Sequence, residues 1–150
     1  STTATSTETI VATVTLPAGI LNTVGVVGEI VSTWSKVCNS TQSVVHKIYL
    51  NAAATLDGNQ DAIMTSTADT DTTHLNNRYF VTFYETAVNG GGVDAQAAFP
   101  NIGFNNYVTT ALTSTDIETS GVTYLIFTTQ NTGAACTATG LQSYRVVIYP

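Results

Sequence analysis

Charge is the scarcest property of this sequence. Charged residues make up 9% of its 150 positions, against roughly 25% in an average soluble protein. Only four of them are cations, namely Lys36, Lys47, Arg78 and Arg145, and the formal net charge is −6. Because a protein that neutralises a phosphate backbone needs clustered lysine and arginine, we expect no nucleic-acid partner.

Long apolar runs are missing as well. No run approaches the roughly 18 residues that a membrane span requires, and the Ser/Thr-rich start lacks the basic and apolar regions of a signal peptide. We therefore expect no membrane partner. The chain begins at Ser1, as removal of an initiator methionine before a small residue would leave it, which favours an intact small protein.

Cysteine is nearly absent. Cys38 and Cys136 are the only two cysteines and lie far apart in the sequence, which argues against a zinc ribbon or a disulfide-dense scaffold. A bond between them would require the fold to bring their Cα atoms within about 7 Å. We expect instead two free thiols, in a chain that folds in a reducing compartment.

What the sequence has in excess is threonine, its commonest residue. The branched Cβ of threonine suits a pleated strand and slightly disfavours a helix. Hydrophobic residues make up 43% of the chain, which is enough for one core. Residues 1–7 have no periodicity and are predicted to form an extended N-terminal arm, whereas residues 8–150 are predicted to form a single domain.

Short apolar segments separated by turn signals follow this arm. In residues 8–16, apolar side chains alternate with threonine, with Ile10, Ala12, Val14 and Leu16 on one face. Comparable segments occupy residues 24–37, 43–51, 62–67, 78–88, 93–98, 104–112, 122–130 and 141–149. No segment has the pattern of a long amphipathic helix. We therefore predict an all-β fold, an antiparallel jelly-roll-type β-sandwich of eight or nine strands.

Two of these segments are apolar on both faces. Residues 78–84 (RYFVTFY) and 123–129 (TYLIFTT) carry large apolar side chains at consecutive positions, although a monomeric sandwich buries only one face of each strand. The second face is expected to lie between subunits, or else under a long loop. The candidate subunit-interface residues are Tyr79, Phe83, Tyr124 and Ile126.

Asp69, Asp71 and His74 form the first candidate site, directly before the aromatic strand. Two carboxylates and an imidazole are suitable for a metal or hydrolytic site. The alternative is a polar loop in which aspartate side chains make local turns. We favour the loop, because no further ligand or nucleophile accompanies the three residues.

Other polar residues give weaker signals. Asp57, Asn59 and Asp61 have the spacing of positions 1, 3 and 5 of a calcium loop, but the glycine and glutamate that this loop requires further on are both replaced by alanine. A simple Asp-Gly turn is expected there. His46 alternates with apolar neighbours and is predicted to be a packed strand residue. We therefore expect neither an enzyme nor a bound cofactor or metal.

Four segments together resemble a known family. They are ETIVATVTLPAGIL (8–21), HKIYLNAAATLDG (46–58), NRYFVTFYE (77–85) and LQSYRVVIYP (141–150). In this order they resemble the jelly-roll domains of tailed-bacteriophage virion proteins, which occur in head fibres, capsid decoration proteins and the tips of tail fibres. The resemblance covers most of residues 8–150 and consists of patterns of strand and turn.

The resemblance implies a non-enzymatic structural protein of a virion, a trimeric capsid decoration or head-fibre knob protein. Its partners would be two further copies of itself and the major capsid protein or another virion protein. It would be located at the virion surface after folding in the host cytoplasm. The N-terminal arm, including Ser1, Thr2, Thr3 and Thr5, would anchor it by adding to a neighbouring sheet edge.

The alternative implied by the same family is a carbohydrate- or receptor-binding tip domain of a tail fibre. Its partner would be a host-surface glycan. Exposed tyrosine and tryptophan side chains would then form a flat platform for the sugar on one sheet or loop rim.

Overall fold

The computed structural model describes residues 7–21, 25–38, 44–66, 73–85, 93–101, 104–111, 121–131 and 136–149. These residues form strands β1 (Thr9–Leu16), β2 (Val27–Cys38), β3 (Val44–Asn51), β4 (Asp61–Thr65), β5 (Thr73–Glu85), β6 (Val93–Asn101), β7 (Phe104–Ala111), β8 (Thr123–Asn131) and β9 (Cys136–Tyr149). No helix occurs among the described residues, so none there is long and apolar enough to cross a membrane. The predicted all-β fold is confirmed.

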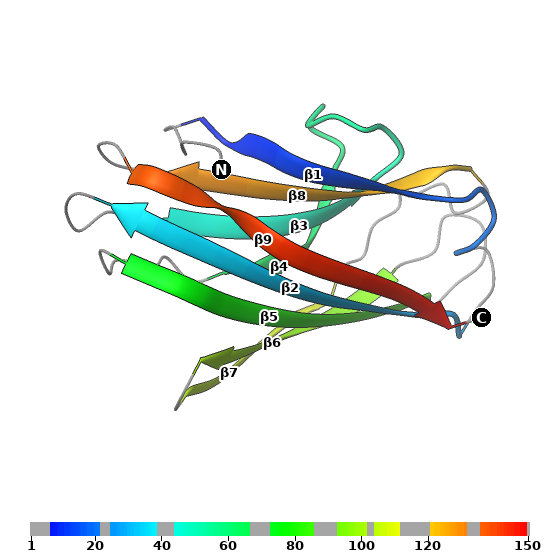
Figure 1. Cartoon of the computed structure of the whole chain (residues 1–150). Coiled ribbons are helices and arrows are strands. Elements are labelled where there is room, and N and C mark those ends of the chain that lie inside the picture. The colour runs from blue at the N-terminus through cyan, green and yellow to red at the C-terminus, as the bar shows by residue number, and fades with distance from the viewer. Residues whose placement is uncertain are drawn as a thin grey trace.

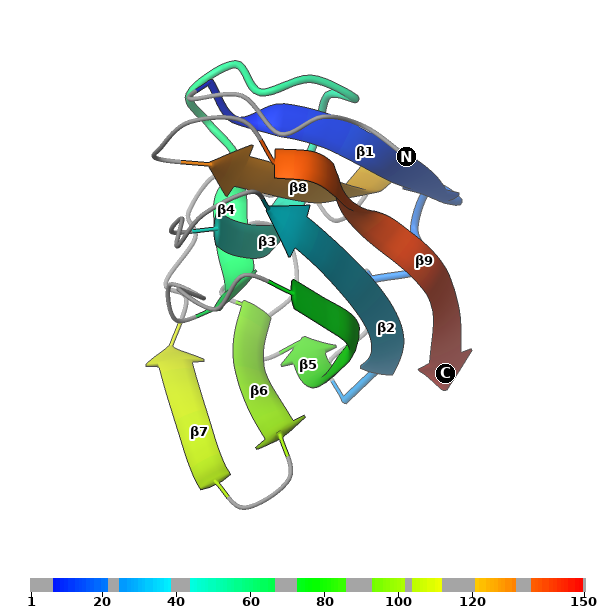
Figure 2. The ribbon, with the colours of Figure 1, turned by 60° about the vertical axis from the view of Figure 1, so that its left-hand side comes forward.

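The strands form two antiparallel sheets that pack face to face as a sandwich (Figure 1). One sheet has the order β1-β8-β3-β4 and the other has the order β7-β6-β5-β2-β9. Figure 2 shows the four-stranded sheet above the five-stranded one, with β6 and β7 extending the lower sheet away from β9. The two-sheet arrangement expected from the sequence is therefore present.

The first strand illustrates why these segments form strands and where they stop. β1 consists largely of threonine and apolar residues, and it ends at Leu16, directly before Pro17, whose carbonyl accepts a 3.2 Å hydrogen bond from the N–H of Ile20. Gly19 adopts a φ of 77° in this turn, a conformation that glycine reaches without steric cost. The alternation predicts that Ile10 shares a face with Ala12, Val14 and Leu16, but a bulge between Ile10 and Ala12 shifts the register, and Ile10 is exposed.

Two strands begin earlier than the sequence predicts. β5 begins at Thr73 and β9 at Cys136, whereas the apolar patterns begin at residues 78 and 141. Both extensions pair with the end of β2, where Val37 lies opposite Thr73 and Cys38 opposite Cys136. The long strand β2 therefore pairs with two stretches, 73–77 and 136–140, whose own pattern predicts no strand.

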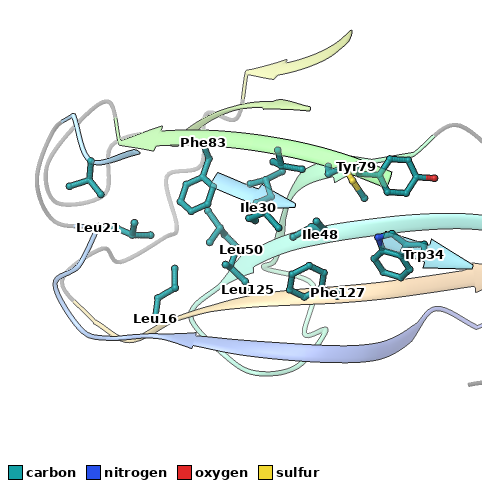
Figure 3. Packing of buried hydrophobic residues seen from close by; sticks show 14 residues of the cluster. Leu16, Leu21, Ile30, Trp34, Ile48, Leu50, Tyr79, Phe83, Leu125 and Phe127 are labelled. Carbon is teal, nitrogen blue, oxygen red and sulfur yellow. The ribbon is translucent and has the colours of Figure 1, made fainter. Parts of the chain in front are cut away.

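The core lies between the sheets and extends along most of β2 (Figure 3). Its buried residues come from both sheets and are Leu16, Leu21, Val26, Ile30, Trp34, Ile48, Leu50, Ile63, Met64, Tyr79, Val81, Phe83, Leu125 and Phe127. In Figure 3, Leu16, Leu21 and Phe83 lie toward one end of this cluster, and Trp34 and Tyr79 lie toward the other.

Three of the four interface candidates are buried within the chain itself. Tyr79 is 6% exposed, while Phe83 and Ile126 are completely buried. Tyr79 and Phe83 belong to the core between the sheets. These side chains therefore cannot supply the exposed apolar surface for which they were predicted, and only Tyr124, which is half-buried, retains part of it.

Ile126 is buried although it lies on the outer face of the four-stranded sheet. Its register partners are Thr13 and Tyr49, and Figures 1 and 2 show the connection between β3 and β4 on the outer side of this sheet. The side-chain amide of Asn51 holds that connection by donating a 2.8 Å hydrogen bond to the carbonyl of Thr55. Ile126 is therefore buried within one chain, without a subunit contact.

Cys38 and Cys136 form a disulfide, so the prediction of two free thiols is wrong. The cysteines are 98 residues apart in the sequence, but their Cα atoms are 3.9 Å apart in the fold. The reason is the antiparallel register of β2 and β9, which places the two residues directly opposite each other. Sequence separation alone contains no information about that register.

Candidate functional site

The interior of the sandwich is polar at one end. Its buried polar residues there are Ser32, Lys36, His46, Ser66, Asn77, Thr129, Asn131 and Thr139. Together with the disulfide they form what we call the polar end, whereas the cluster around Ile30, Leu50 and Phe83 forms the apolar end. Most of the buried polar side chains that the structure describes thus gather where β2 ends and β9 begins.

His46 lies at the boundary between the two ends. It is fully buried, and its ring stacks on Trp34 with centroids 4.3 Å apart and an interplanar angle of 27°. Its backbone N–H donates to the Ser66 hydroxyl oxygen at 2.9 Å, and the N–H of Ser66 donates to the His46 carbonyl at 2.9 Å. The prediction that His46 is a packed strand residue is confirmed.

Trp34 is equally inaccessible. It is completely buried, and its indole N–H donates a 2.9 Å hydrogen bond to the hydroxyl of Ser32. A sugar platform requires an exposed aromatic face. The chain's single tryptophan is therefore not part of such a platform.

Lys36 is the polar residue that sequence reasoning missed. It is completely buried in β2, opposite His74 of β5 and Thr139 of β9. The alternation of β2 could have predicted its burial, because it places Lys36 on the same face as Ile30 and Trp34. An interior lysine is rare unless its charge is compensated, so this position is a specific feature of the polar end.

The first candidate site is only partly described. The structure places His74 in β5, as the register partner of Lys36, while Asp69 and Asp71 lie outside the described residues. Within the described part of the chain, no group of three or more histidine, cysteine, aspartate or glutamate side chains could hold a metal ion. A site made of these three residues stays untested.

A second polar cluster lies on the outer face of the four-stranded sheet, at the level of the polar end. One oxygen of Glu8 accepts hydrogen bonds from Tyr49 at 2.8 Å and from Thr128, and the other accepts a bond from the Lys47 ammonium at 3.1 Å. Lys47 also lies 5.6 Å from the centre of the Tyr49 ring. These contacts join the start of β1 to β8 and β3, and nothing in the sequence spacing predicts them.

The titration of this cluster follows from its contacts. Burial would raise the pKa of the Glu8 carboxyl, but the bonds from Thr128, Tyr49 and Lys47 outweigh burial and hold the pKa below its ordinary value. Burial would lower the pKa of Lys47, yet its contacts with Tyr49 and Glu8 raise it. Burial raises the pKa of Tyr49. The contact with Glu8 raises it further, whereas the contact with Lys47 lowers it. The charged pair Glu8–Lys47 is thus favoured at neutral pH.

The calcium-like spacing around Asp57 is a turn. One oxygen of the Asp57 carboxylate accepts the backbone N–H of Asn59 at 3.0 Å and the side-chain amide of Asn51 at 3.2 Å. The bond from Asn59 is the main reason why the pKa of Asp57 is lowered. Gly58, with a φ of 94°, follows in the turn. The expected Asp-Gly turn is confirmed.

A different kind of surface lies on the outer face of the five-stranded sheet. Phe80 and Tyr149 are 38% and 48% exposed, and Arg78 and Arg145 are exposed beside them. Neither arginine makes an ion pair within the described residues. The Tyr149 hydroxyl donates to Glu29 at 3.1 Å. We call this surface, formed by β5, β2 and β9, the β5-β2-β9 face.

No protein-family model, no curated protein and no solved structure matches the chain. The resemblance to virion jelly-roll domains therefore remains a prediction. The predicted anchoring residues Ser1, Thr2, Thr3 and Thr5 lie outside the described residues.

Proposed function

We propose that this chain is a non-enzymatic structural protein of a virion surface, a jelly-roll-type decoration or head-fibre knob protein. The observation that carries the proposal is that polar side chains of this chain join separate parts of its backbone. Glu8 joins three strands, Ser66 joins β4 to β3, and Asp57 closes a turn. Each of these groups fastens one part of the backbone to another, which is suited to a durable shell component.

The disulfide adds to this support. A bond that closes a loop of 98 residues resists unfolding mainly by restricting the unfolded chain. Disulfides persist in oxidising surroundings such as virion surfaces and are rare in the cytoplasm. A protein that folds in the host cytoplasm would therefore form this bond after release of the particle, when stability outside the cell is needed.

Self-association remains part of the proposal, and the resemblance to virion jelly-roll domains implies a homotrimer as its form. Its physical basis changes, because Tyr79, Phe83 and Ile126 are covered within one chain. Phe80 and Tyr149, two of the exposed large hydrophobic side chains, instead offer apolar area to a neighbour. The major capsid protein or another virion protein would receive the N-terminal arm.

The test is to purify particles from the source culture by density gradient and to measure their protein content by mass spectrometry. The chain is expected in the particle fraction at a fixed ratio to the most abundant capsid protein. Its complete absence from intact particles would contradict the proposal. Loss of the chain from the particles on deleting residues 1–7 would support the anchoring role of the arm.

The receptor-binding tip is the second candidate, favoured by one observation. The β5-β2-β9 face combines the exposed rings of Phe80 and Tyr149 with Arg78 and Arg145, and aromatic faces with hydrogen-bond donors suit sugars. A glycan array separates the two candidates. Hits that disappear in a Phe80→Ser variant would favour the tip domain.

A further inference from the structure

Self-association, on which this inference rests, requires a surface that a second copy can cover. From the exposed residues and their register we infer that the β5-β2-β9 face docks on the same face of a second copy, about a twofold axis parallel to β2. The inference goes beyond the proposed function because it assigns the contact surface and replaces threefold by twofold symmetry.

The composition of the face is that of an interface. Of the chain's four cations, Lys36 is buried and Lys47 is paired with Glu8. The other two, Arg78 and Arg145, are both exposed on this one face. Protein interfaces are enriched in arginine and aromatic residues and depleted in lysine. An acidic chain that keeps its free arginines beside exposed rings therefore presents a surface suited to a protein partner.

The register shows that the face is complementary to itself. Val31 of β2 lies opposite Phe80 on β5 and opposite Arg145 on β9, so the three residues form one row with Val31 in the middle. A twofold axis parallel to β2 places β5 of one copy over β9 of the other. Phe80 then faces the second copy's Arg145, and the reverse pair forms on the other side of the axis.

The chemistry of this pairing is favourable. A guanidinium over an aromatic face is attracted by the negative potential of the ring, and this attraction strengthens when the pair is removed from water. The neighbouring row carries Arg78 on β5 and Ser143 on β9, both opposite Thr33, so the same axis places an arginine over a serine. Neither row brings two arginines together.

A single patch favours a twofold contact over a ring. A ring needs two different complementary patches on each copy, whereas an isologous dimer needs one patch that is complementary to itself. Among the residues whose side-chain exposure the structure describes, the exposed large hydrophobic side chains are Ile10, Phe80, Val122, Tyr144 and Tyr149. Phe80 and Tyr149 share the β5-β2-β9 face, with the partly buried Val27, Val31 and Val147 between and beside them.

The size of the face predicts a modest affinity. β2, β5 and β9 contain 12, 13 and 14 residues, which gives a surface about 14 Å wide and about 40 Å long, or roughly 560 Å² in projection. Stable interfaces bury about 600–1,000 Å² on each partner. The contact therefore lies just below this range, and dissociation is expected in the micromolar region.

Sedimentation equilibrium of the whole chain across the micromolar range tests the inference. The wild type is expected to approach twice the mass of 15.7 kDa. Phe80→Ser and Arg145→Gln should each weaken the dimer about tenfold or more, which is about 1.4 kcal/mol. Because the two side chains meet, the double variant should lose no more than the worse single variant. Ile10→Ser is the matched control, since Ile10 is 36% exposed on the other sheet, and it should leave the dimer intact.

Other outcomes of the sedimentation experiment would contradict the inference in different ways. A trimer, or a dimer that survives both Phe80→Ser and Arg145→Gln, would overturn the twofold contact while leaving self-association in place. A wild type that stays monomeric up to the highest concentration would overturn this inference together with the self-association in the proposed function. Unchanged far-UV spectra and thermal unfolding of the variants show that they retain the fold.

Discussion

The apolar end and the polar end of the sandwich are built by the same strands but held together differently. At the apolar end, β2 contributes Gly28 and Ile30, which pack against Phe83 and its neighbours. At the polar end, the same strand contributes Lys36 and Cys38. Burial of apolar surface stabilises the first end by about 25 cal/mol per Å². The second end gains little from burial, because a polar group removed from water costs free energy unless it is bonded.

Bonds of three kinds replace apolar packing at the polar end. The disulfide joins β2 to β9, and the amide of Asn131 donates a 3.3 Å hydrogen bond to the Cys136 sulfur. Ser66 and His46 exchange two hydrogen bonds in the interior. On the outer face, Glu8 joins three strands. A threonine-rich sandwich can thus extend its strands beyond its apolar core if a disulfide and hydrogen bonds continue where the core stops.

The largest expected effect is on the polar end. Replacing both Cys38 and Cys136 by serine removes the closure of a 98-residue loop, which should lower the free energy of unfolding by about 4 kcal/mol. Urea unfolding of the wild type and the variant measures this difference. A reducing agent should destabilise the wild type by a similar amount and leave the variant unchanged. Equal stabilities would show that the polar end does not depend on its covalent tie.

The sequence predicted the strands well where their pattern is local. The segment 43–51 became β3, the segment 104–112 became β7 and the segment 122–130 became β8, each within one residue at either end. Alternation along a strand reflects one face in contact with the core, and this information is present in neighbouring residues. The buried position of His46 followed from the same pattern.

The sequence did not predict contacts that depend on the pairing of distant strands. Cys38 meets Cys136, and Glu8 meets Thr128, only because of the register between strands far apart in the sequence. A shift by one residue would turn every side chain of a strand to the other face. For the same reason the sequence showed that residues 79–84 are apolar on both faces, but it could not show that Phe80, and not Tyr79, is the exposed one.

Gly28→Ala should produce the next largest effect, at the apolar end. A Cβ atom at this position would lie 2.1 Å from the Cζ atom of Phe83, so the ring must move within a packed core. Such overpacking costs about 1–3 kcal/mol, and we expect a value near the upper limit. Thermal unfolding measures the loss. In a Phe83→Leu background the same substitution should cost less, and an equal cost in both backgrounds would exclude the ring as its cause.

Ser66→Ala should have a smaller effect, at the boundary of the polar end. The substitution leaves the buried N–H of His46 without its 2.9 Å partner, which costs about 1–2 kcal/mol. A change of this size lowers the melting temperature by roughly 2–8 °C in a domain of this length. Ser66→Thr keeps the hydroxyl and is the control. If alanine and threonine behave alike, volume and not the hydrogen bond determines stability at this position.

The smallest effect, and the one most dependent on pH, concerns the cluster around Glu8. The folded pKa of Glu8 lies below its ordinary value of 4.5, so the folded chain binds fewer protons than the unfolded chain near that pH. Its contribution is therefore fully present above about pH 4.5 and is lost as the pH falls through the folded pKa. Lys47, whose folded pKa is raised, shows the opposite behaviour, and its contribution is lost only when the pH rises above its ordinary value of 10.5.

Glu8→Gln isolates this contribution. At pH 7 the variant should lose about 1 kcal/mol, because a neutral amide forms weaker bonds with Lys47 and Tyr49 than a carboxylate does. Between pH 5 and pH 3 the wild type should lose stability faster than the variant, since only the wild type has a carboxylate to protonate at this position, and the two curves should converge. Chemical unfolding at a series of pH values measures both.

Because the cluster joins β1 to β8 and β3 outside the core, the loss should appear first as faster hydrogen exchange in β1. If the curves stay parallel in acid, Glu8 does not hold β1 at the polar end, and the hydrogen bonds between β1 and β8 alone must do so.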